Sequence, residues 1–164
     1  MNSDHVDTII RQWKHERPDI DVSSMAVLAR VVRLERMMNT FIQRSVSKYR
    51  LTLGEFDVLA ALRRSGDPYT LTPTDLFRLL LRSSGGMTNR IDKLERSGLV
   101  TRKPDPNDRR GILVALTPGG LEVIDKAIED YASNLDMLIE PLTKKERADL
   151  EGLLRKLLSC LERK

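Results

Sequence analysis

Apolar residues recur mostly at three- and four-residue steps along the first third of the chain. This spacing places them on one face of a helix, which we expect to run from a cap at Ser23 or Ser24 to about Tyr49. A shorter helix is expected before it, over residues 6–15, and Pro18 should close that turn because proline disfavours helical backbone at the residue before it. The apolar positions of the long helix are Met25, Leu28, Val32, Leu34, Met38, Phe41, Ile42 and Val46.

Capping residues divide the next part of the chain into three short helices. Thr52 and Glu55 have the spacing of a capping box, in which each side chain accepts a hydrogen bond from the other residue's backbone. Thr72 is a candidate N-cap with Pro73 at the first helical position, and Ser83 or Ser84 is a candidate N-cap of the next helix. Gly98 suits the left-handed backbone conformation that often ends a helix. The expected helices therefore run from Leu53 to about Arg64, from Pro73 to about Leu81, and from Ser83 or Ser84 to Gly98. Three short helices joined by brief turns are typical of a helix-turn-helix, and the last of them is its recognition helix.

Two β-prone runs follow, over residues 99–103 and 112–116, on either side of a cluster rich in Pro, Asn, Asp and Gly. This pattern predicts a β-hairpin. A hairpin directly after a recognition helix is a wing, and Arg109 and Arg110 occupy its tip. Asp108 beside them is expected to pair with one of the two arginines and hold the shape of the loop.

The last third of the chain predicts two more helices. Thr117 and Pro118 begin one that runs to about Glu140, where Pro141 ends it, and a second capping box at 143–146 opens a helix to about Glu162. Their apolar stripes are Ile124, Ile128, Tyr131, Leu135 and Leu138, and Leu150, Leu153, Leu154, Leu157, Leu158 and Leu161. Such stripes are usually core, but a small winged domain cannot cover all of them. We therefore favour a two-fold dimer interface. The predicted fold class is mainly α: a winged helix-turn-helix core with a two-stranded β wing, flanked by N- and C-terminal dimerisation helices.

The net charge is concentrated in one segment. The chain has 164 residues, a formal net charge of +4 and a pI of about 9.4. Between Arg82 and Arg110 there are eight basic and four acidic residues, so this segment holds the whole excess and the remainder is neutral. The basic residues are Arg82, Arg90, Lys93, Arg96, Arg102, Lys103, Arg109 and Arg110. A solvated charged face is the ordinary explanation, but this concentration favours a polyanionic partner such as double-stranded DNA.

Other classes of protein are disfavoured by what the sequence contains. It has no run of about 18 apolar residues that would span a membrane and no secretory signal, so we expect a cytoplasmic protein. The single cysteine, Cys160, fits a reducing compartment, and together with His5 and His15 it is too little for a usual zinc site. The sequence shows no glycine-rich phosphate loop and no nucleophile elbow, so we expect neither an enzyme nor a cofactor.

Polar residues at the start of the predicted recognition helix are candidates for DNA contacts. Hydroxyls and helix N-terminal amides suit phosphates, whereas Asn and Arg suit base edges. Arginines in a wing can reach the adjacent minor groove. The candidates are Ser83, Ser84, Met87, Thr88, Asn89, Arg90, Lys93, Arg109 and Arg110. For each polar residue taken alone, ordinary solvent exposure is the competing interpretation.

Three motifs in order, residues 83–100, 105–110 and 116–120, resemble the MarR family of winged-helix regulators over about Ser24 to Leu161. The resemblance implies a homodimer that binds a pseudo-palindromic operator, generally as a repressor released by a small molecule. It divides the chain into an N-terminal extension helix and linker (1–22) and a MarR-type domain (23–161). Within that domain, the winged helix-turn-helix covers about 51–117 and the dimerisation helices about 24–50 and 118–162.

The N-terminal extension narrows the resemblance to the urate-responsive, PecS-like branch of the family. In that branch an effector site is marked by a Trp, an Asp and two Arg, and the matching residues here are Trp13, Asp57, Arg90 and Arg102. An aromatic face and a guanidinium fork suit a planar anionic purine. Asp57 would accept from a ring N–H of the ligand or pair with Arg102 in the empty site. An Arg on the recognition helix would couple the ligand to DNA binding.

Simpler interpretations of the same residues stay open. Trp13 can be a hydrophobic anchor, Asp57 an ion-pair partner, and Arg90 a phosphate contact. The effector can instead be a phenolic acid, another aromatic acid or an aromatic acyl-CoA. Cys160 is expected to be buried as a small hydrophobe, although it could make the protein a redox sensor. A purely architectural DNA-binding protein is a further alternative.

Overall fold

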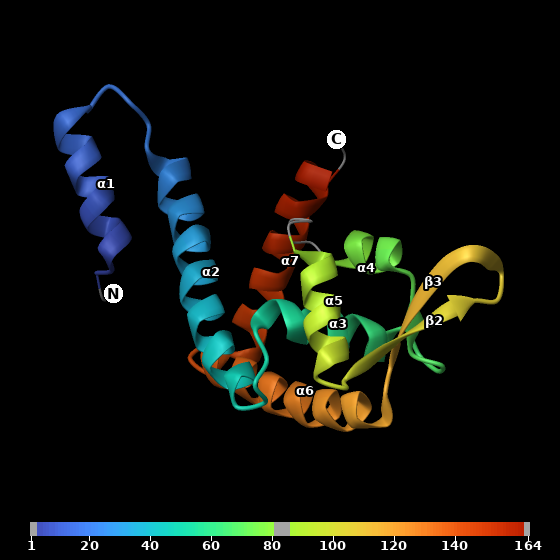
Figure 1. Cartoon of the computed structure of the whole chain (residues 1–164). Helices are drawn as coiled ribbons and strands as arrows, with labels where there is room; N and C mark the ends of the chain where they lie inside the picture. The colour runs from blue at the N-terminus through green and yellow to red at the C-terminus, as the bar shows by residue number, and fades with distance from the viewer. Residues whose placement is uncertain (1–2, 81–85, 163–164) are drawn as a thin grey trace. The chain divides into compact units, whose positions relative to one another are not determined.

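A computed structural model describes residues 3–80 and 86–162, and the side chain of Arg109 lies outside this description. Within these residues there are seven helices and a small antiparallel sheet (Figure 1). The chain divides into two compact units, residues 1–44 and 45–164. None of the described helices combines the length and the apolarity needed to cross a membrane.

The first unit contains α1 (His5–Glu16) and most of α2 (Ser23–Ser47). Both predicted helices are present, but their starts are set by aspartates. Asp4 caps α1 through the backbone N–H groups of residues 6 and 7, and Asp21, instead of a serine cap, accepts from the backbone N–H of Ser23 at 2.9 Å. Arg30 of α2 reaches both Asp4 (2.8 Å) and Asp7 (2.6 Å), which joins the two helices. The backbone N–H of Asp4 and then the guanidinium of Arg30 lower the pKa of Asp7.

The second unit begins with the end of α2 and contains α3 (Leu53–Arg64), α4 (Pro73–Leu79) and α5 (Met87–Arg96). The capping box of Thr52 and Glu55 is formed, and the N-cap at Thr72 is confirmed. The expected cap at Ser83 or Ser84 lies outside the described residues. The described helix begins at Met87, after Gly86, whose φ of 104° no other residue type adopts easily.

The sheet has the strand order β1-β3-β2, with β1 at Thr70–Leu71, β2 at Val100–Asp105 and β3 at Asp108–Leu116. The predicted wing is present, and its strands extend farther toward the tip than the β-prone runs indicated. Arg109 and Arg110 consequently lie at the beginning of β3, directly after the turn. The two-residue strand β1, which pairs with residues 114–115 of β3, was not predicted.

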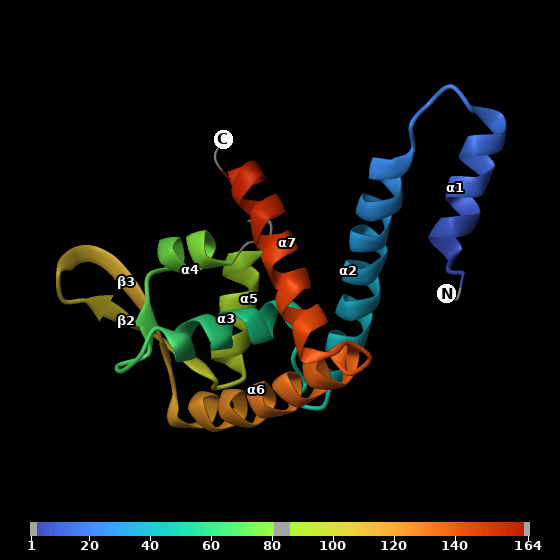
Figure 2. The same ribbon diagram turned by 180° about the vertical axis from the view of Figure 1, so that it is seen from behind.

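The chain ends with α6 (Pro118–Ile139) and α7 (Lys144–Glu162), close to the predicted bounds. In both whole-chain views α6 runs along one side of α3 (Figures 1 and 2). An ion pair of Arg63 with Asp125 at 2.6 Å and a ring contact of Phe56 with Tyr131 join the two helices. The core of the second unit gathers around α3. Its fully buried members include Leu59, Leu62, Leu76, Ile91, Leu94 and Ile124.

Large apolar side chains stay exposed on the outer helices. Helix α7 buries none of its residues, and Leu153 and Leu161 expose 62% and 71% of their surface. On α2, Val32 exposes 67%. Cys160 is also exposed, so its expected burial is not seen within one chain.

Candidate DNA-binding surface and effector residues

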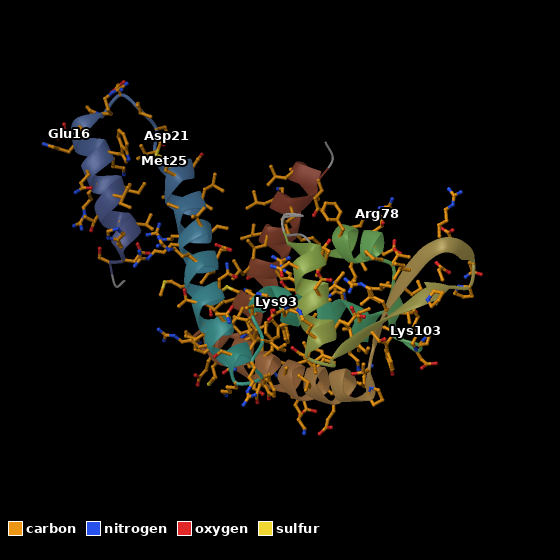
Figure 3. The ribbon with its side chains drawn as sticks, viewed as in Figure 1. Glu16, Asp21, Met25, Arg78, Lys93 and Lys103 are labelled. Atoms are coloured by element: carbon orange, nitrogen blue, oxygen red, sulfur yellow. The ribbon has the colours of Figure 1, made fainter. Side chains whose placement is uncertain are left out.

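Helix α5 has a core face and an outward face. Met87, Ile91 and Leu94 recur at four- and three-residue steps and are 7%, 2% and 1% exposed. This burial corrects the assignment of Met87 as a DNA contact, because its side chain packs in the core. The exposed residues are Thr88, Asn89, Lys93 and Arg96. Figure 3 shows Lys93 on α5 and Lys103 on the neighbouring strand β2.

Arg96 also belongs to the outward face, although it is not among the residues predicted to contact DNA. It follows Lys93 by three residues and Asn89 by seven, which is the spacing of one helix face. Its Nε donates to the backbone carbonyl of Asp92 at 3.2 Å. The helical spacing from Asn89 was the signal that could have identified it.

The wing tip is held by carboxylates that accept from the backbone. Asp105 accepts from the N–H of Asn107, and Asp108 accepts from the N–H of Arg110, both at 2.9 Å. Asp108 therefore holds the loop as expected, but through the main chain of Arg110 and not through an ion pair with its guanidinium. The side chain of Arg110 is exposed, so it is available to an anionic partner.

Arg102 is engaged by the recognition helix. Its guanidinium pairs with Asp92 at 2.5 Å and with Glu95, and its backbone N–H donates to Glu95 at 3.0 Å. The hydrogen bonds of Asp92 and then Glu95 raise the pKa of the Arg102 guanidinium. These two carboxylates, both on α5, take the place of the expected pairing with Asp57. The arrangement ties the base of the wing to α5.

Arg90 lies against the first turn of α3. A Cβ added at Gly54 would come within 2.5 Å of the Arg90 Nε and 2.8 Å of its Cζ, so the guanidinium occupies the space that the glycine leaves open. Asp57 follows Gly54 by three residues and therefore lies on the same side of α3. Both Arg90 and Asp57 are half-buried. The structure thus brings two of the four predicted effector residues to neighbouring positions.

Arg102 is placed elsewhere within the second unit, whereas Trp13 belongs to the first unit. Arg102 contacts the α5 positions of Asp92 and Glu95, which are about 140° to 200° around the helix from Arg90 because a helix has 3.6 residues per turn. The two arginines thus occupy different flanks of α5. Trp13 is on α1 in the first unit, where 43% of it is exposed.

The recognition helix, the sheet and the hairpin define a winged helix-turn-helix, a class of DNA-binding domain. The MarR family model matches residues 51–111. The chain is 35% identical to the transcriptional regulator PecS of Dickeya dadantii, over 91% of this chain and 90% of that protein. It is 35% identical to the multiple antibiotic resistance protein MarR of Escherichia coli, over 77% of this chain and 89% of that protein. The chain therefore belongs to the MarR family.

Solved structures agree with this assignment. A mutant MarR from Escherichia coli, crystallised in complex with operator DNA, matches with a TM-score of 0.72 at 30% identity, over 84% of this chain and 97% of that chain. The regulator AbsC from Streptomyces coelicolor matches with a TM-score of 0.78 over 88% of this chain and 98% of that chain, and at 19% identity it supports the fold alone. The chain is a MarR-family transcriptional regulator.

Proposed function

We propose that this regulator is a homodimeric repressor that binds a pseudo-palindromic operator and is released by urate or a related small aromatic anion. The observation that carries the DNA-binding part is the exposed polar face of α5 beside a wing whose Arg110 is also exposed. A helix of this kind fits the major groove, and a wing arginine reaches the backbone or the minor groove. Among the described residues, the DNA contacts we propose are Thr88, Asn89, Arg90, Lys93, Arg96 and Arg110. Ser83, Ser84 and the Arg109 side chain lie outside the described residues and stay predictions.

The dimer is supported by the apolar surface that one chain leaves uncovered. The leucine stripe of α7 and the apolar residues of α2 would face water in a monomer. Contiguous apolar surfaces of this kind mark protein interfaces. A two-fold dimer would present two recognition helices to successive major grooves, about 10 bp apart.

The effector proposal is supported by the four matching residue types and by the similarity to PecS. Trp13 supplies an aromatic face, Arg90 and Arg102 supply guanidinium groups, and Asp57 supplies an acceptor. Because Asp92 and Glu95 hold Arg102, an anionic ligand would compete with these carboxylates for it. Arg90 belongs to α5, so a ligand that moves it acts directly on the recognition helix.

Urate is expected to lower the affinity for the operator and to raise the melting temperature. At a hundredfold excess over its Kd, a ligand adds about 2.7 kcal/mol of stability, or about 5–10 °C for a chain of this size. The measurement is a mobility-shift titration on the promoter beside the protein's own gene, with thermal unfolding in parallel. Trp13→Ala should lose the response, and Trp13→Phe, which keeps an aromatic face, should retain it.

An unchanged melting temperature at millimolar urate would remove urate from the proposal. The family membership would stand. The next effectors to test in the same assay are phenolic acids, other aromatic acids and aromatic acyl-CoA esters.

Gly54→Ala is expected to displace the Arg90 side chain without unfolding the protein. The clash is with the far end of a flexible side chain, and alanine is the better helix former by about 1 kcal/mol. We expect the ligand affinity to fall about tenfold, the size of a lost charge-assisted hydrogen bond, while the melting temperature does not decrease.

The control for this prediction is a double-mutant cycle. If Gly54→Ala acts through Arg90, then it should cost nothing further in an Arg90→Ala background. Additive losses in ligand affinity would show that the glycine acts by another route.

A further inference from the structure

The carboxylate of Glu95 on α5 binds Arg102 of the wing at two places. One of its oxygens accepts from the backbone N–H of Arg102 at 3.0 Å, and the other pairs with the Arg102 guanidinium. Asp92, about one helical turn earlier, accepts from the same guanidinium at 2.5 Å. Glu95 therefore holds the main chain of β2 as well as the arginine side chain, whereas Asp92 holds the side chain alone.

The backbone contact of Glu95 lies at the open edge of the sheet. Strand β2 stands at one end of the order β1-β3-β2, so among the described strands none accepts from the N–H groups on its outer side. At Arg102 the Glu95 carboxylate takes the place of that missing strand. A side chain of the recognition helix thus fixes the main chain of the wing directly.

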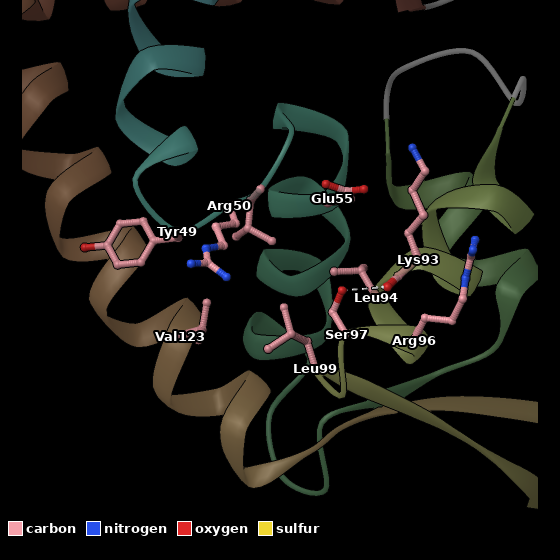
Figure 4. A pocket seen from close by; sticks show the side chains of 10 residues that line it. Tyr49, Arg50, Glu55, Lys93, Leu94, Arg96, Ser97, Leu99 and Val123 are labelled. Carbon is pink, nitrogen blue, oxygen red and sulfur yellow. Dashed lines mark hydrogen bonds between the residues drawn. The ribbon is translucent and has the colours of Figure 1, made fainter.

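The end of α5 leads into β2 through a short turn. Figure 4 shows this turn, in which the Ser97 hydroxyl donates to the Lys93 carbonyl at 2.9 Å. Farther along the wing, the backbone N–H groups of Asn107 and Arg110 donate to carboxylates of the hairpin itself. Of the hydrogen bonds that join the described residues of α5 to the wing, those at Arg102 are therefore the closest to the wing tip.

The distance from this contact to the wing tip magnifies any movement of the wing. Arg102 faces Val114 across the hairpin, and Arg110 precedes Val114 by four residues. At about 3.3 Å per residue, Arg110 lies about 13 Å from the contact, so a tilt of about 10° would move it by about 2 Å. A shift of this size breaks a hydrogen bond to a phosphate, because such bonds span only about 2.7–3.2 Å.

Electrostatics alone would disfavour these two carboxylates on a DNA-binding helix. Asp92 and Glu95 expose 44% and 37% of their side-chain surface, and negative charge near DNA is repelled by the phosphates. Arg102 carries one positive charge against their two, so the group keeps a net negative charge. If charge were its only contribution, removal of Glu95 would strengthen binding to DNA of any sequence.

We propose that Glu95 is a positioning residue for operator recognition, which fixes the wing against α5 so that Arg110 and the recognition helix engage one half-site together. The inference rests on the proposed function, in which Arg110 is a DNA contact. Unrelated DNA offers phosphates but no matching base edges to α5, so binding there does not require both elements in fixed positions. Glu95 therefore contributes to operator binding and not to DNA binding in general.

Glu95→Ala is expected to weaken operator binding about tenfold, the size of a lost charge-assisted hydrogen bond at the wing, without weakening binding to unrelated DNA. The measurement is a fluorescence anisotropy titration of the full-length protein, without urate, on the promoter beside its own gene and on an unrelated duplex. Glu95→Gln keeps an oxygen for the Arg102 N–H and should stay within about threefold of the unmodified protein.

Glu122→Ala is the matched control. It removes the same charge, here from an exposed pair with Lys126 on α6 at 2.7 Å, and should bind both DNAs normally. Thermal unfolding of each variant without DNA identifies any loss of folding. A partly unfolded variant would lose affinity for both DNAs equally, so the ratio of operator binding to unrelated binding reports the positioning role.

A double-mutant cycle with Arg110→Ala tests the route of the effect. If Glu95 acts by placing Arg110, then Arg110→Ala should cost little further operator affinity in a Glu95→Ala background. The proposal is overturned by additive losses in this cycle, by equal losses on operator and unrelated DNA, or by an operator affinity that Glu95→Ala leaves unchanged or raises.

Failure of the proposed function gives a different result from failure of this inference. If Arg110→Ala alone leaves operator affinity unchanged, the wing contact of the proposed function is wrong, and the positioning role is wrong with it. If Arg110→Ala weakens operator binding but the cycle with Glu95→Ala is additive, only the positioning role is wrong. The urate assignment is independent of both results, because every titration omits urate.

Discussion

Gly120→Ala is expected to unfold the winged domain or to destabilise it severely. A Cβ at this position would overlap the carbonyl oxygen of Leu99, lie 2.9 Å from its carbonyl carbon and lie 3.3 Å from a methyl group of Leu116. The first two are backbone atoms at the start of the wing, so no side-chain rotation relieves the clash. We expect a loss of about 3 kcal/mol or more in the free energy of unfolding, at the upper end for overpacking.

The surrounding hydrogen bonds explain why the clash is so costly. The Thr117 hydroxyl accepts from the Gly120 N–H at 2.9 Å and donates to the Gly98 carbonyl at 2.7 Å. The Thr117 N–H donates to the carbonyl of Leu99 at 3.1 Å. Moving Leu99 away from a new methyl group would break these hydrogen bonds, which connect the end of α5, the wing and α6.

Gly119→Ala is the matched control. Its Cβ would meet only the Thr117 hydroxyl oxygen, at an ordinary 3.8 Å, and it stands in the same helical turn. Urea unfolding followed by circular dichroism should show a normal or higher midpoint for Gly119→Ala and a greatly reduced midpoint for Gly120→Ala. Equal midpoints would contradict the packing argument.

The sequence predicted best those elements whose bounds are set by residues close to one another in the sequence. The capping boxes at Thr52 and Thr143 each involve a partner three residues away, so the helix starts could be inferred locally. The same holds for the hairpin turn at 105–108. Strand β1 was missed because it is two residues long and exists only through pairing with residues more than 40 positions later.

The candidate site shows the same division. Helical spacing indicates that Asn89 and Lys93 face outward, and the same spacing from Ile91 and Leu94 could have placed Met87 in the core. No spacing could show that Arg90 lies against Gly54, or that Arg102 pairs with Asp92 and Glu95. These positions are set by packing between α5, α3 and β2. Residue types could therefore nominate candidates for the site, but they could not predict its geometry.

Asn89→Ala and Arg110→Ala are expected to weaken operator binding in two different ways. Asn89 is exposed on the outward face of α5, where an amide reads base edges, so its loss should cost about 1–3 kcal/mol per half-site and relax sequence preference. In a homodimer the substitution occurs in both half-sites, so the expected total is about 2–6 kcal/mol, or at least about thirtyfold in affinity. Binding to unrelated DNA should be little changed.

Arg110→Ala should weaken binding to all sequences and reduce its dependence on salt. An exposed wing arginine that neutralises a phosphate releases about 0.9 counterion, so a dimer should lose about 1.8 from the slope of log affinity against log salt. The measurement is a titration of each variant on operator and on unrelated DNA at several salt concentrations. Lys145→Ala, which removes an exposed cation from the first turn of α7, is the control and should keep the normal slope. If Arg110→Ala kept the full slope while Asn89→Ala reduced it, the assignment of base contact to α5 and backbone contact to the wing would be reversed.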